Sequence, residues 1–255
     1  MLKKRIIPVL LLKDGRMVKG KKFKDYIDTG NPISQVKIYT SQYTDELMFI
    51  DIQATINSRK TLINIITNSA RESQMPFSVG GGIKSISDIR EILAAGADKV
   101  LINTSAFENY DFIKQAVKKF GSQAIILGID YKYNNEINQN RVWTHSGTTQ
   151  TEAEPFELSK IYQDLNVGEI MLNSIDRDGM MKGYDIELGS KMSKTLEIPV
   201  ILCGGGGNFN HLVEVFNKTE VAATACGSLF HFGDNSPMRA RSHLKNQKIL
   251  MRSIK

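Results

Sequence analysis

The amino-acid sequence predicts a (β/α)8 barrel of the α/β class, and three observations support this prediction. The chain has 255 residues, a length at which α/β barrels commonly form one domain. Eight short apolar runs alternate with longer segments of helical periodicity, as expected for parallel strands that are buried on both faces. The sequence also repeats itself at a fixed offset. We therefore expect one domain over residues 1–255, built from two half-barrels of about 1–120 and 121–255.

The predicted strands follow one another along the whole chain. They are Ile6–Leu12, Leu47–Ile52, Pro76–Val79, Lys99–Ile102, Ala124–Ile129, Glu169–Leu172, Pro199–Leu202 and Val221–Ala225. Between two of them, the segment Ser87–Gly96 has the spacing of a helix with one apolar face, and its final glycine can end that helix. A doubly wound open sheet is the competing architecture. It would normally have fewer strands and a glycine-rich turn after the first one, which Lys13-Asp14-Gly15 is not.

The internal repeat consists of two pairs of motifs that share an offset of 123 residues. Pro76–Gly82 matches Pro199–Gly205, and Ile102–Phe107 matches Ala225–Phe230. Two motifs at one offset indicate a duplicated unit. No change of composition separates the halves, so we expect them to form one domain.

Composition and charge exclude several classes of protein. Hydrophobic residues make up 41% and charged residues 24% of the chain, which is typical of a folded protein and not of a disordered one. The net charge of +6 is too mild for a typical nucleic-acid binder, whereas a basic rim would attract anionic small molecules. The longest apolar run, Ile6–Leu12, is shorter than the roughly 18–20 residues that span a bilayer. We therefore expect no membrane segment and no nucleic-acid partner.

Cysteine and histidine usage bears on location and on metals. Two cysteines exclude a disulfide framework and suit the reducing cytoplasm, where we expect the protein to act. The four histidines show no ligand spacing, so we expect neither a metal site nor a cofactor.

Each half of the sequence has glycines after one predicted strand and a small-residue turn after the next. The first half has Gly81-Gly82 and Asn103-Thr104, and the second has Gly204-Gly205 and Gly227-Ser228. Backbone N–H groups without a neighbouring Cβ can approach an anion closely, and a following helix N-terminus favours negative charge. Tight turns are the alternative explanation, but it is weaker for two symmetry-related runs. We therefore predict two phosphate sites, with Asp178 assigned to the same set, and a substrate with a phosphate at each end.

Motifs along the whole chain are similar to those of one enzyme family. They include Lys13–Arg16, Val79–Ile83, Gly96–Val100, Phe120–Ala124 and Ser174–Gly179. With these motifs the chain resembles the cyclase subunit of imidazole glycerol phosphate synthase over essentially its whole length. The resemblance implies a (β/α)8 barrel that forms a heterodimer with a glutaminase at its N-terminal face. Ammonia would then travel through the barrel core to a small, phosphorylated, nucleotide-like substrate at the C-terminal face.

The family performs its cyclisation with two aspartates, one at the end of the first strand and one at the end of the fifth. Such chemistry moves several protons and needs an acid and a base. Asp130 occupies the fifth-strand position, but the first-strand position holds Leu11, which cannot exchange a proton. Aligning Ile6–Lys13 with Ile125–Lys132 identifies the same gap within this chain. Further departures near this face are Val9, Asn173 and Cys203.

The opposite end keeps the family's pattern. The resemblance places a ring of two basic and two acidic side chains at the ammonia entrance, formed by Arg5, Glu46, Lys99 and Glu169. A purely structural ring of salt bridges is the alternative for four such charges. Asp98 resembles the residue that contacts the glutaminase, and Lys19 lies in the family's mobile first loop. Retention of the ring without the first aspartate indicates a working channel but argues against the original cyclisation.

We interpret the chain as a paralogue that receives ammonia from a glutaminase and delivers it to a different phosphorylated acceptor, as a subunit of a glutamine-dependent synthase. Members without the first-strand aspartate resemble the branch that serves acetamidino modification of surface-glycan sugars together with a separate sugar amidotransferase. Two alternatives remain open. One is a cyclase of histidine biosynthesis that works with Asp130 alone, and the other is a non-catalytic barrel that only activates its glutaminase.

Overall fold

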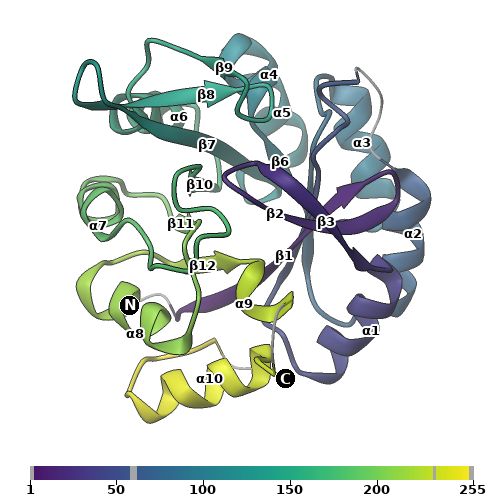
Figure 1. The fold of residues 1–255 in the computed structure, drawn as a ribbon. Helices are drawn as coiled ribbons and strands as arrows, with labels where there is room; N and C mark the ends of the chain where they lie inside the picture. Colours follow the sequence, from purple (N-terminus) through teal and green to yellow (C-terminus); the bar gives the residue numbers. More distant parts are fainter. Residues whose placement is uncertain (1–2, 58–61, 232–233, 253–255) are drawn as a thin grey trace.

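The computed structural model describes residues 3–57, 62–231 and 234–252, and within them eight parallel strands close into a barrel (Figure 1). The barrel strands are β1 (Arg5–Lys13), β4 (Leu47–Asp51), β5 (Phe77–Gly80), β6 (Lys99–Ile102), β7 (Ile125–Asn134), β10 (Glu169–Ser174), β11 (Val200–Cys203) and β12 (Ala223–Cys226). They pair in chain order, β12 pairs with β1, and β10 pairs with β7, so the sheet is closed. The predicted (β/α)8 barrel and its eight strands are confirmed.

Helices connect the strands and cover the outside of the barrel, as Figure 1 shows. They are α1 (Pro32–Ser41), α2 (Ile63–Glu72), α3 (Ile86–Ala94), α5 (Tyr110–Phe120), α6 (Pro155–Asp164), α7 (Ile186–Thr195), α8 (Phe209–Lys218) and α10 (Pro237–Asn246). Several begin with a side-chain cap of the kind that the sequence favours. The Ser85 hydroxyl, for example, accepts a hydrogen bond from the N–H of Asp88 and fixes the start of α3. In the described residues, no helix is long and apolar enough to span a bilayer.

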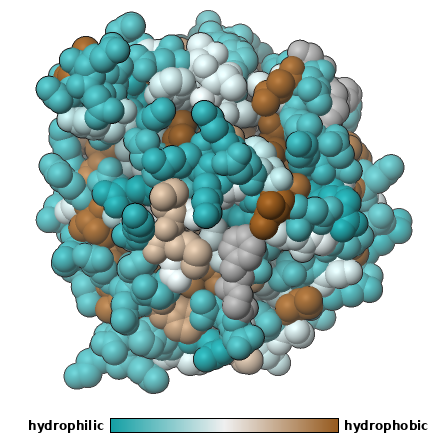
Figure 2. Space-filling model, in the orientation of Figure 1, coloured by the Kyte–Doolittle hydropathy of each residue, from teal (hydrophilic) through white to brown (hydrophobic). Residues whose placement is uncertain are grey.

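The barrel strands bury both of their faces because alternate side chains point into the barrel or out toward the helices. The inner cluster consists of Ile7, Val9, Met48, Leu101, Ile126, Met171, Ile201, Ala223 and Ala225. A larger outer cluster packs the strands against the helices and includes Leu10, Phe49 and Leu127. The interior is therefore a packed apolar layer that separates the two ends of the barrel. On the face drawn in Figure 2, by contrast, hydrophilic residues dominate and apolar ones stand in small separate groups.

Additional antiparallel strands extend the sheet beyond the carboxyl ends of the barrel strands, and the sequence analysis did not predict them. They are β2 (Arg16–Lys21), β3 (Lys24–Gly30), β8 (Gln139–Thr144) and β9 (Thr149–Gln150). The β1–β2 turn is made by Asp14 and Gly15, both with positive φ, which is the conformation that an Asp-Gly hairpin turn requires. The resulting β2–β3 hairpin lies across the front of the barrel in Figure 1. Two short helices, α4 (Thr104–Glu108) and α9 (Ser228–His231), also start at strand ends.

The internal repeat agrees with the observed elements at one clear place. β5 and β11 both begin and end 123 residues apart, the offset found between the glycine motifs. The division of the chain into two half-barrels remains a prediction.

Candidate active site and charged ring

A pocket of about 330 Å³ opens at the carboxyl ends of the barrel strands. The residues that the sequence assigned to phosphate binding and catalysis all line it: Leu11, Gly81, Gly82, Asn103, Thr104, Asp130, Asp178, Gly204, Gly205, Gly227 and Ser228. They come together because parallel strands present all their carboxyl ends at one face of the barrel, where such enzymes carry their active sites. The fold therefore unites residues that lie more than half the chain apart.

The glycines of the two predicted cradles are also required by close approaches of the backbone. Gly81 has φ +101° and a Cβ there would lie 2.1 Å from the Asp51 carbonyl oxygen. Gly205 has φ +109° and a Cβ would lie 2.0 Å from the Gly183 carbonyl oxygen. Tight packing alone thus explains why no larger residue stands at these positions. Ser228 provides a separate indication for the second cradle, because its Oγ is buried without a hydrogen-bond partner.

Asp130 lies next to last in the buried part of β7 and lines this pocket. Its Oδ1 accepts a hydrogen bond of 2.8 Å from Asn173 Nδ2, and its Oδ2 accepts one of 2.7 Å from Asn103 Nδ2. The pKa of Asp130 is raised to about 7, chiefly by burial and also by the charge of the nearby Asp178. The hydrogen bonds from the two amides act in the opposite direction and lower it. A carboxyl group with a pKa near neutrality can both take up and release a proton at physiological pH.

The wall formed by the first strand is apolar. Leu11 of β1 stands opposite Ile50 of β4 in the parallel register, and Val9, Ile50 and Leu101 line the same pocket. Leu11 has no carboxylate, so among the described residues this position of β1 offers no acid–base partner to Asp130. The pocket therefore has one polar side, with Asn103, Asp130 and Asn173, and one apolar side.

Lys19 and Asp178 form an ion pair inside the pocket. The distance from Lys19 Nζ to Asp178 Oδ1 is 2.8 Å, and the Lys19 side chain is only 5% exposed. Asp178 Oδ2 is buried without a partner. Lys19 lies on β2, so the ion pair ties the β2–β3 hairpin to the loop after β10, and the Lys22 N–H adds a hydrogen bond of 2.9 Å to the Asp178 carbonyl oxygen. The sequence analysis assigned these two residues to separate roles and did not foresee their contact.

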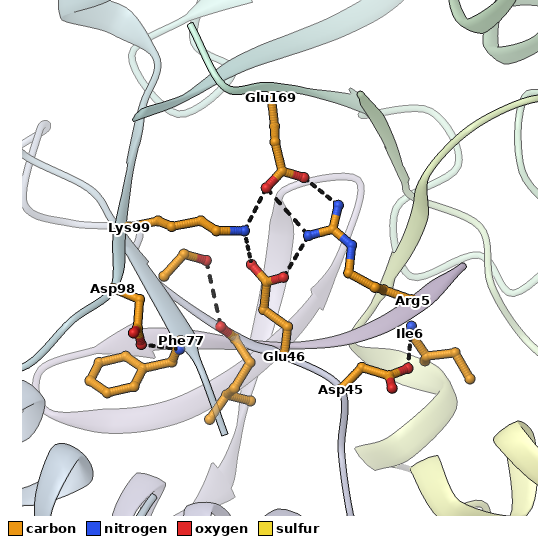
Figure 3. A network of polar contacts seen from close by, with 10 residues as sticks. Arg5, Ile6, Asp45, Glu46, Phe77, Asp98, Lys99 and Glu169 are labelled. Atoms are coloured by element: carbon orange, nitrogen blue, oxygen red, sulfur yellow. Dashed lines mark hydrogen bonds and ion pairs between the residues drawn. The ribbon is translucent and has the colours of Figure 1, made fainter. Parts of the chain in front are cut away.

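The opposite end of the barrel carries the four charges expected there, and they contact one another (Figure 3). Arg5 Nη1 lies 2.6 Å from Glu46 Oε2, and Arg5 Nη2 forms a second ion pair with Glu169 Oε2. Lys99 Nζ lies 2.9 Å from Glu46 Oε1 and 2.5 Å from Glu169 Oε1. Each basic side chain therefore contacts both acids, and each acid contacts both bases. We call these four residues the charged ring.

The ring favours the ionised forms of Arg5 and Glu169. Burial by itself raises the pKa of Glu169, but hydrogen bonds and charge attraction from Arg5 and Lys99 lower it below its ordinary value. Burial likewise lowers the pKa of Arg5, and its bonds to Glu169 and Glu46 more than reverse this. Charge-assisted, partly bidentate bonds of this kind are among the stronger hydrogen bonds in proteins. The ring is therefore a fixed cluster of paired charges.

Asp98 lies beside the ring on the exposed rim, as Figure 3 shows. Its Oδ2 accepts a hydrogen bond of 2.9 Å from the Phe77 N–H, which joins β5 to the start of β6. The exposed side chain is thus held in a fixed position on the N-terminal face, where a partner can reach it.

Leu101 separates the ring from the pocket, and the sequence analysis did not single it out. Leu101 lies two positions after Lys99 and two positions before Asn103, along β6 and the residue that follows it. The three side chains therefore point to the same side. A Cβ at Gly80 would lie 3.0 Å from the Leu101 Cβ, and one at Gly128 would lie 3.4 Å from its Cδ1. The glycines on both neighbouring strands therefore make room for this leucine. Alternation along β6 is the signal that could have identified it.

The β2–β3 hairpin contributes two further pocket residues that the sequence analysis missed, Phe23 and Tyr26. The Asp14-Gly15 turn indicates that β1 folds back into β2, but the turn between β2 and β3, at Lys22 and Phe23, carries no glycine or other turn signal. No group of three or more His, Cys, Asp or Glu side chains able to hold a metal ion occurs within residues 3–57, 62–231 and 234–252.

Comparisons with known proteins agree with this architecture. A family model described as "Histidine biosynthesis protein" matches residues 5–236. The chain belongs to this family. The imidazole glycerol phosphate synthase subunit HisF of Geobacillus thermodenitrificans (strain NG80-2) is 40% identical over 252 residues, covering 99% of this chain and 100% of the relative. The subunits of the same name from Hydrogenobaculum sp. (strain Y04AAS1) and Bacillus subtilis (strain 168) are 42% and 40% identical with the same coverage. The protein is thus a HisF-like barrel.

Proposed function

We propose that this HisF-like barrel receives ammonia from a glutaminase at the charged ring and delivers it to a small phosphorylated acceptor in the pocket. The arrangement of β6 and the residue after it is the main support for this proposal. Lys99 lies in the ring, Leu101 in the apolar interior and Asn103 beside Asp130. Neutral ammonia crosses an apolar layer more easily than ammonium or other ions, because a charge in a medium of low dielectric is strongly disfavoured. The exposed Asp98 beside the ring supports a heterodimer contact on this face.

The acceptor that we propose differs from the substrate of the family's cyclisation. Leu11 makes one wall of the pocket apolar where the family uses a carboxylate, so the first strand offers Asp130 no acid–base partner at this position. This departure favours the branch that modifies surface-glycan sugars with acetamidino groups, acting with a separate sugar amidotransferase. We place this activity in the cytoplasm, because Cys203 and Cys226 are unpaired thiols.

A cyclase of histidine biosynthesis that uses Asp130 alone is the second candidate. The relatives favour it, because three proteins named imidazole glycerol phosphate synthase subunit HisF match over 99% of this chain. The raised pKa of Asp130 also lets one carboxyl act as acid and as base in turn.

Complementation distinguishes the two candidates. A histidine auxotroph that lacks its own cyclase subunit would receive this chain together with a matching glutaminase. We expect no growth without histidine, and growth would overturn the proposed change of acceptor. In parallel, purification of the tagged chain from its native cell should recover a glutaminase. Recovery of an active glutaminase without any aminated product would favour the non-catalytic activating barrel.

The two proposed phosphate sites have their own test. The first comprises Gly81, Gly82, Asn103 and Thr104, and the second Asp178, Gly204, Gly205, Gly227 and Ser228. Crystals grown in sulfate or phosphate should show an anion at one or both cradles. Empty cradles under saturating phosphate would contradict a substrate with a phosphate at each end.

A further inference from the structure

Two amide side chains at the carboxyl ends of adjacent strands enclose a single titratable group, Asp130. Asn173 of β10 stands directly opposite Asp130 of β7 in the parallel register, and Asn103 follows β6 on the other side. Each oxygen of the Asp130 carboxylate accepts a hydrogen bond from one of the two amides. Asn173 is only 7% exposed, so neighbouring strands and not solvent hold it against the carboxylate.

The other end of the Asn173 amide has no partner. Its Oδ1 is buried and accepts no hydrogen bond, which is costly for a carbonyl oxygen unless some state of the site uses it. The oxygen and nitrogen ends of an amide have nearly the same size. A half-turn of the amide would therefore exchange them without needing more room, and Oδ1 would then face Asp130.

Such an exchange matches the two protonation states of a carboxyl group. An ionised carboxylate only accepts hydrogen bonds and is served by Nδ2, whereas a protonated carboxyl donates through its O–H and is served by Oδ1. An asparagine can satisfy both states in turn, which neither a leucine nor an ionised aspartate could do. The group that it serves is Asp130, which has Leu11 and not a second aspartate at the corresponding position of the first strand.

We propose that Asn173 is a positioning residue that lets Asp130 act as the sole acid–base group of ammonia transfer, and this inference rests on the function proposed above. The lone pair of ammonia forms a bond to an electrophilic carbon of the acceptor, and the proton released by the nitrogen passes to ionised Asp130. Protonated Asp130 then delivers this proton to the oxygen or nitrogen that leaves the same carbon. Asp130 returns to its starting state, so no further reagent is needed.

The surroundings of Asp130 keep both states accessible. Burial and the charge of Asp178 favour the protonated form, and the amides of Asn103 and Asn173 favour the ionised form. Lys19 holds Asp178 in an ion pair, and Tyr26 and Cys203 are the other titratable groups that sense the charge of Asp130. Asp51, Lys84, Glu108 and His145 line the same pocket. The pKa of Asp130 therefore lies near neutrality as the result of opposing effects, and removal of the Asn173 donor would change it.

A carboxyl 13C NMR titration of the full chain tests this inference, with the Asp130 signal assigned by its loss in Asp130→Asn. We expect a midpoint near pH 7 in the unmodified protein. In Asn173→Leu the midpoint should rise by roughly one pH unit or more, because a bond to the ionised form is stronger than one to the neutral form. The Asn173 side-chain amide signal of the unmodified protein should change with the same midpoint as Asp130.

Asn217→Leu is the matched control, since Asn217 is exposed on α8 and its replacement should leave the midpoint unchanged. An unchanged midpoint in folded Asn173→Leu would overturn the inference. If that variant fails to fold, Asn173→Asp replaces it and should give a coupled pair with one midpoint above that of the unmodified protein. Two independent, ordinary carboxyl titrations would again contradict it. The titration contains neither glutaminase nor acceptor, so its result does not depend on ammonia transfer. Failure of the proposed ammonia transfer would appear only in separate measurements of glutamate release and aminated product.

Discussion

Buried charge is treated in opposite ways by the charged ring at one end of the barrel and by Asp130 at the other. At the N-terminal end, Arg5, Lys99, Glu46 and Glu169 contact one another, and every charge has two partners of opposite sign. At the C-terminal end, Asp130 is equally enclosed but receives only amide hydrogen bonds, and its pKa rises to about 7. Paired charges give a cluster that stays ionised, whereas an unpaired carboxyl gives a group that can change its state. The difference predicts that substitutions at the two ends have different signs and different pH dependence.

Glu46→Gln should have the largest effect on stability. Glu46 is fully buried and bonds both bases of the ring, so its neutralisation leaves excess positive charge in the barrel end. We expect a loss of about 3–5 kcal/mol in the free energy of unfolding, the usual cost of breaking a buried ion pair. Denaturant unfolding at pH 7 measures it. Glu187→Gln, at an exposed position of α7, is the control and should be near neutral. Equal losses for both variants would show that the ion pairs of the ring do not stabilise the fold.

Asp130→Asn should stabilise the fold with a characteristic pH dependence. The unfolded carboxyl loses its proton near pH 4 and the folded one near pH 7. Stability of the unmodified protein therefore falls as pH rises through this window, because the unfolded state releases its proton first. The variant lacks this loss, so its advantage should grow by on the order of 2–4 kcal/mol between pH 4 and pH 8. Denaturant unfolding of both proteins at the two pH values measures the change. A constant difference would mean that Asp130 titrates normally.

Lys99→Ala should separate stability from function at the charged end. Its side chain is 18% exposed, and Arg5 still pairs with both acids when it is removed, so the loss of stability should be smaller than that of Glu46→Gln. The charged ring without Lys99 should nevertheless no longer couple the two reactions. Glutamine is then hydrolysed without a matching transfer of ammonia to the acceptor. The ratio of glutamate released to aminated product, measured with the co-purified glutaminase, is the readout. Lys118→Ala on the exposed face of α5 is the control. An unaltered ratio would reduce the ring to a structural cluster of salt bridges.

Leu11→Asp should have the smallest functional effect, although it restores the family's pair of aspartates. We expect little or no activity on the cyclase substrate of the family, because the resemblance indicates further departures at Val9, Asn173 and Cys203, which line the same pocket. Catalysis is lost by misplacement of reacting groups by about an ångström. The assay compares this variant with Leu11→Asn, which adds polarity without a proton-exchanging group. Substantial activity in Leu11→Asp alone would show that the pocket still accommodates the original reaction.

The sequence predicted most of the fold because the pattern of a buried parallel strand is local. Runs such as Leu47–Ile52 and Glu169–Leu172 are continuous and apolar, and the structure places strands there. The ring residues and Asp130 were named through the resemblance to the cyclase family, whereas the glycine cradles could be recognised from their places after the apolar runs and from the internal repeat. The β2–β3 hairpin was missed because Arg16–Lys21 and Lys24–Gly30 are rich in polar residues, and the turn between them, at Lys22 and Phe23, has no glycine to indicate it.

Contacts between side chains from different strands could not be predicted in the same way. The ion pair of Lys19 with Asp178 depends on how far the hairpin folds over the pocket. The two amides around Asp130 depend on the stagger of three neighbouring strands, and the role of Leu101 depends on glycines on both sides. These features arise from three-dimensional distances that no spacing in the sequence encodes.

The pairing of the first strand has a consequence for synthesis of the chain. β1 pairs on one side with β4, and on the other side with β12, while Lys4 forms a bridge to Met251. One edge of β1 thus stays unpaired during synthesis until residues 223–226 have been added. An open strand edge is a template for pairing with other molecules. The interval before residues 223–226 emerge is therefore when the nascent protein is most exposed to aggregation and most dependent on chaperones.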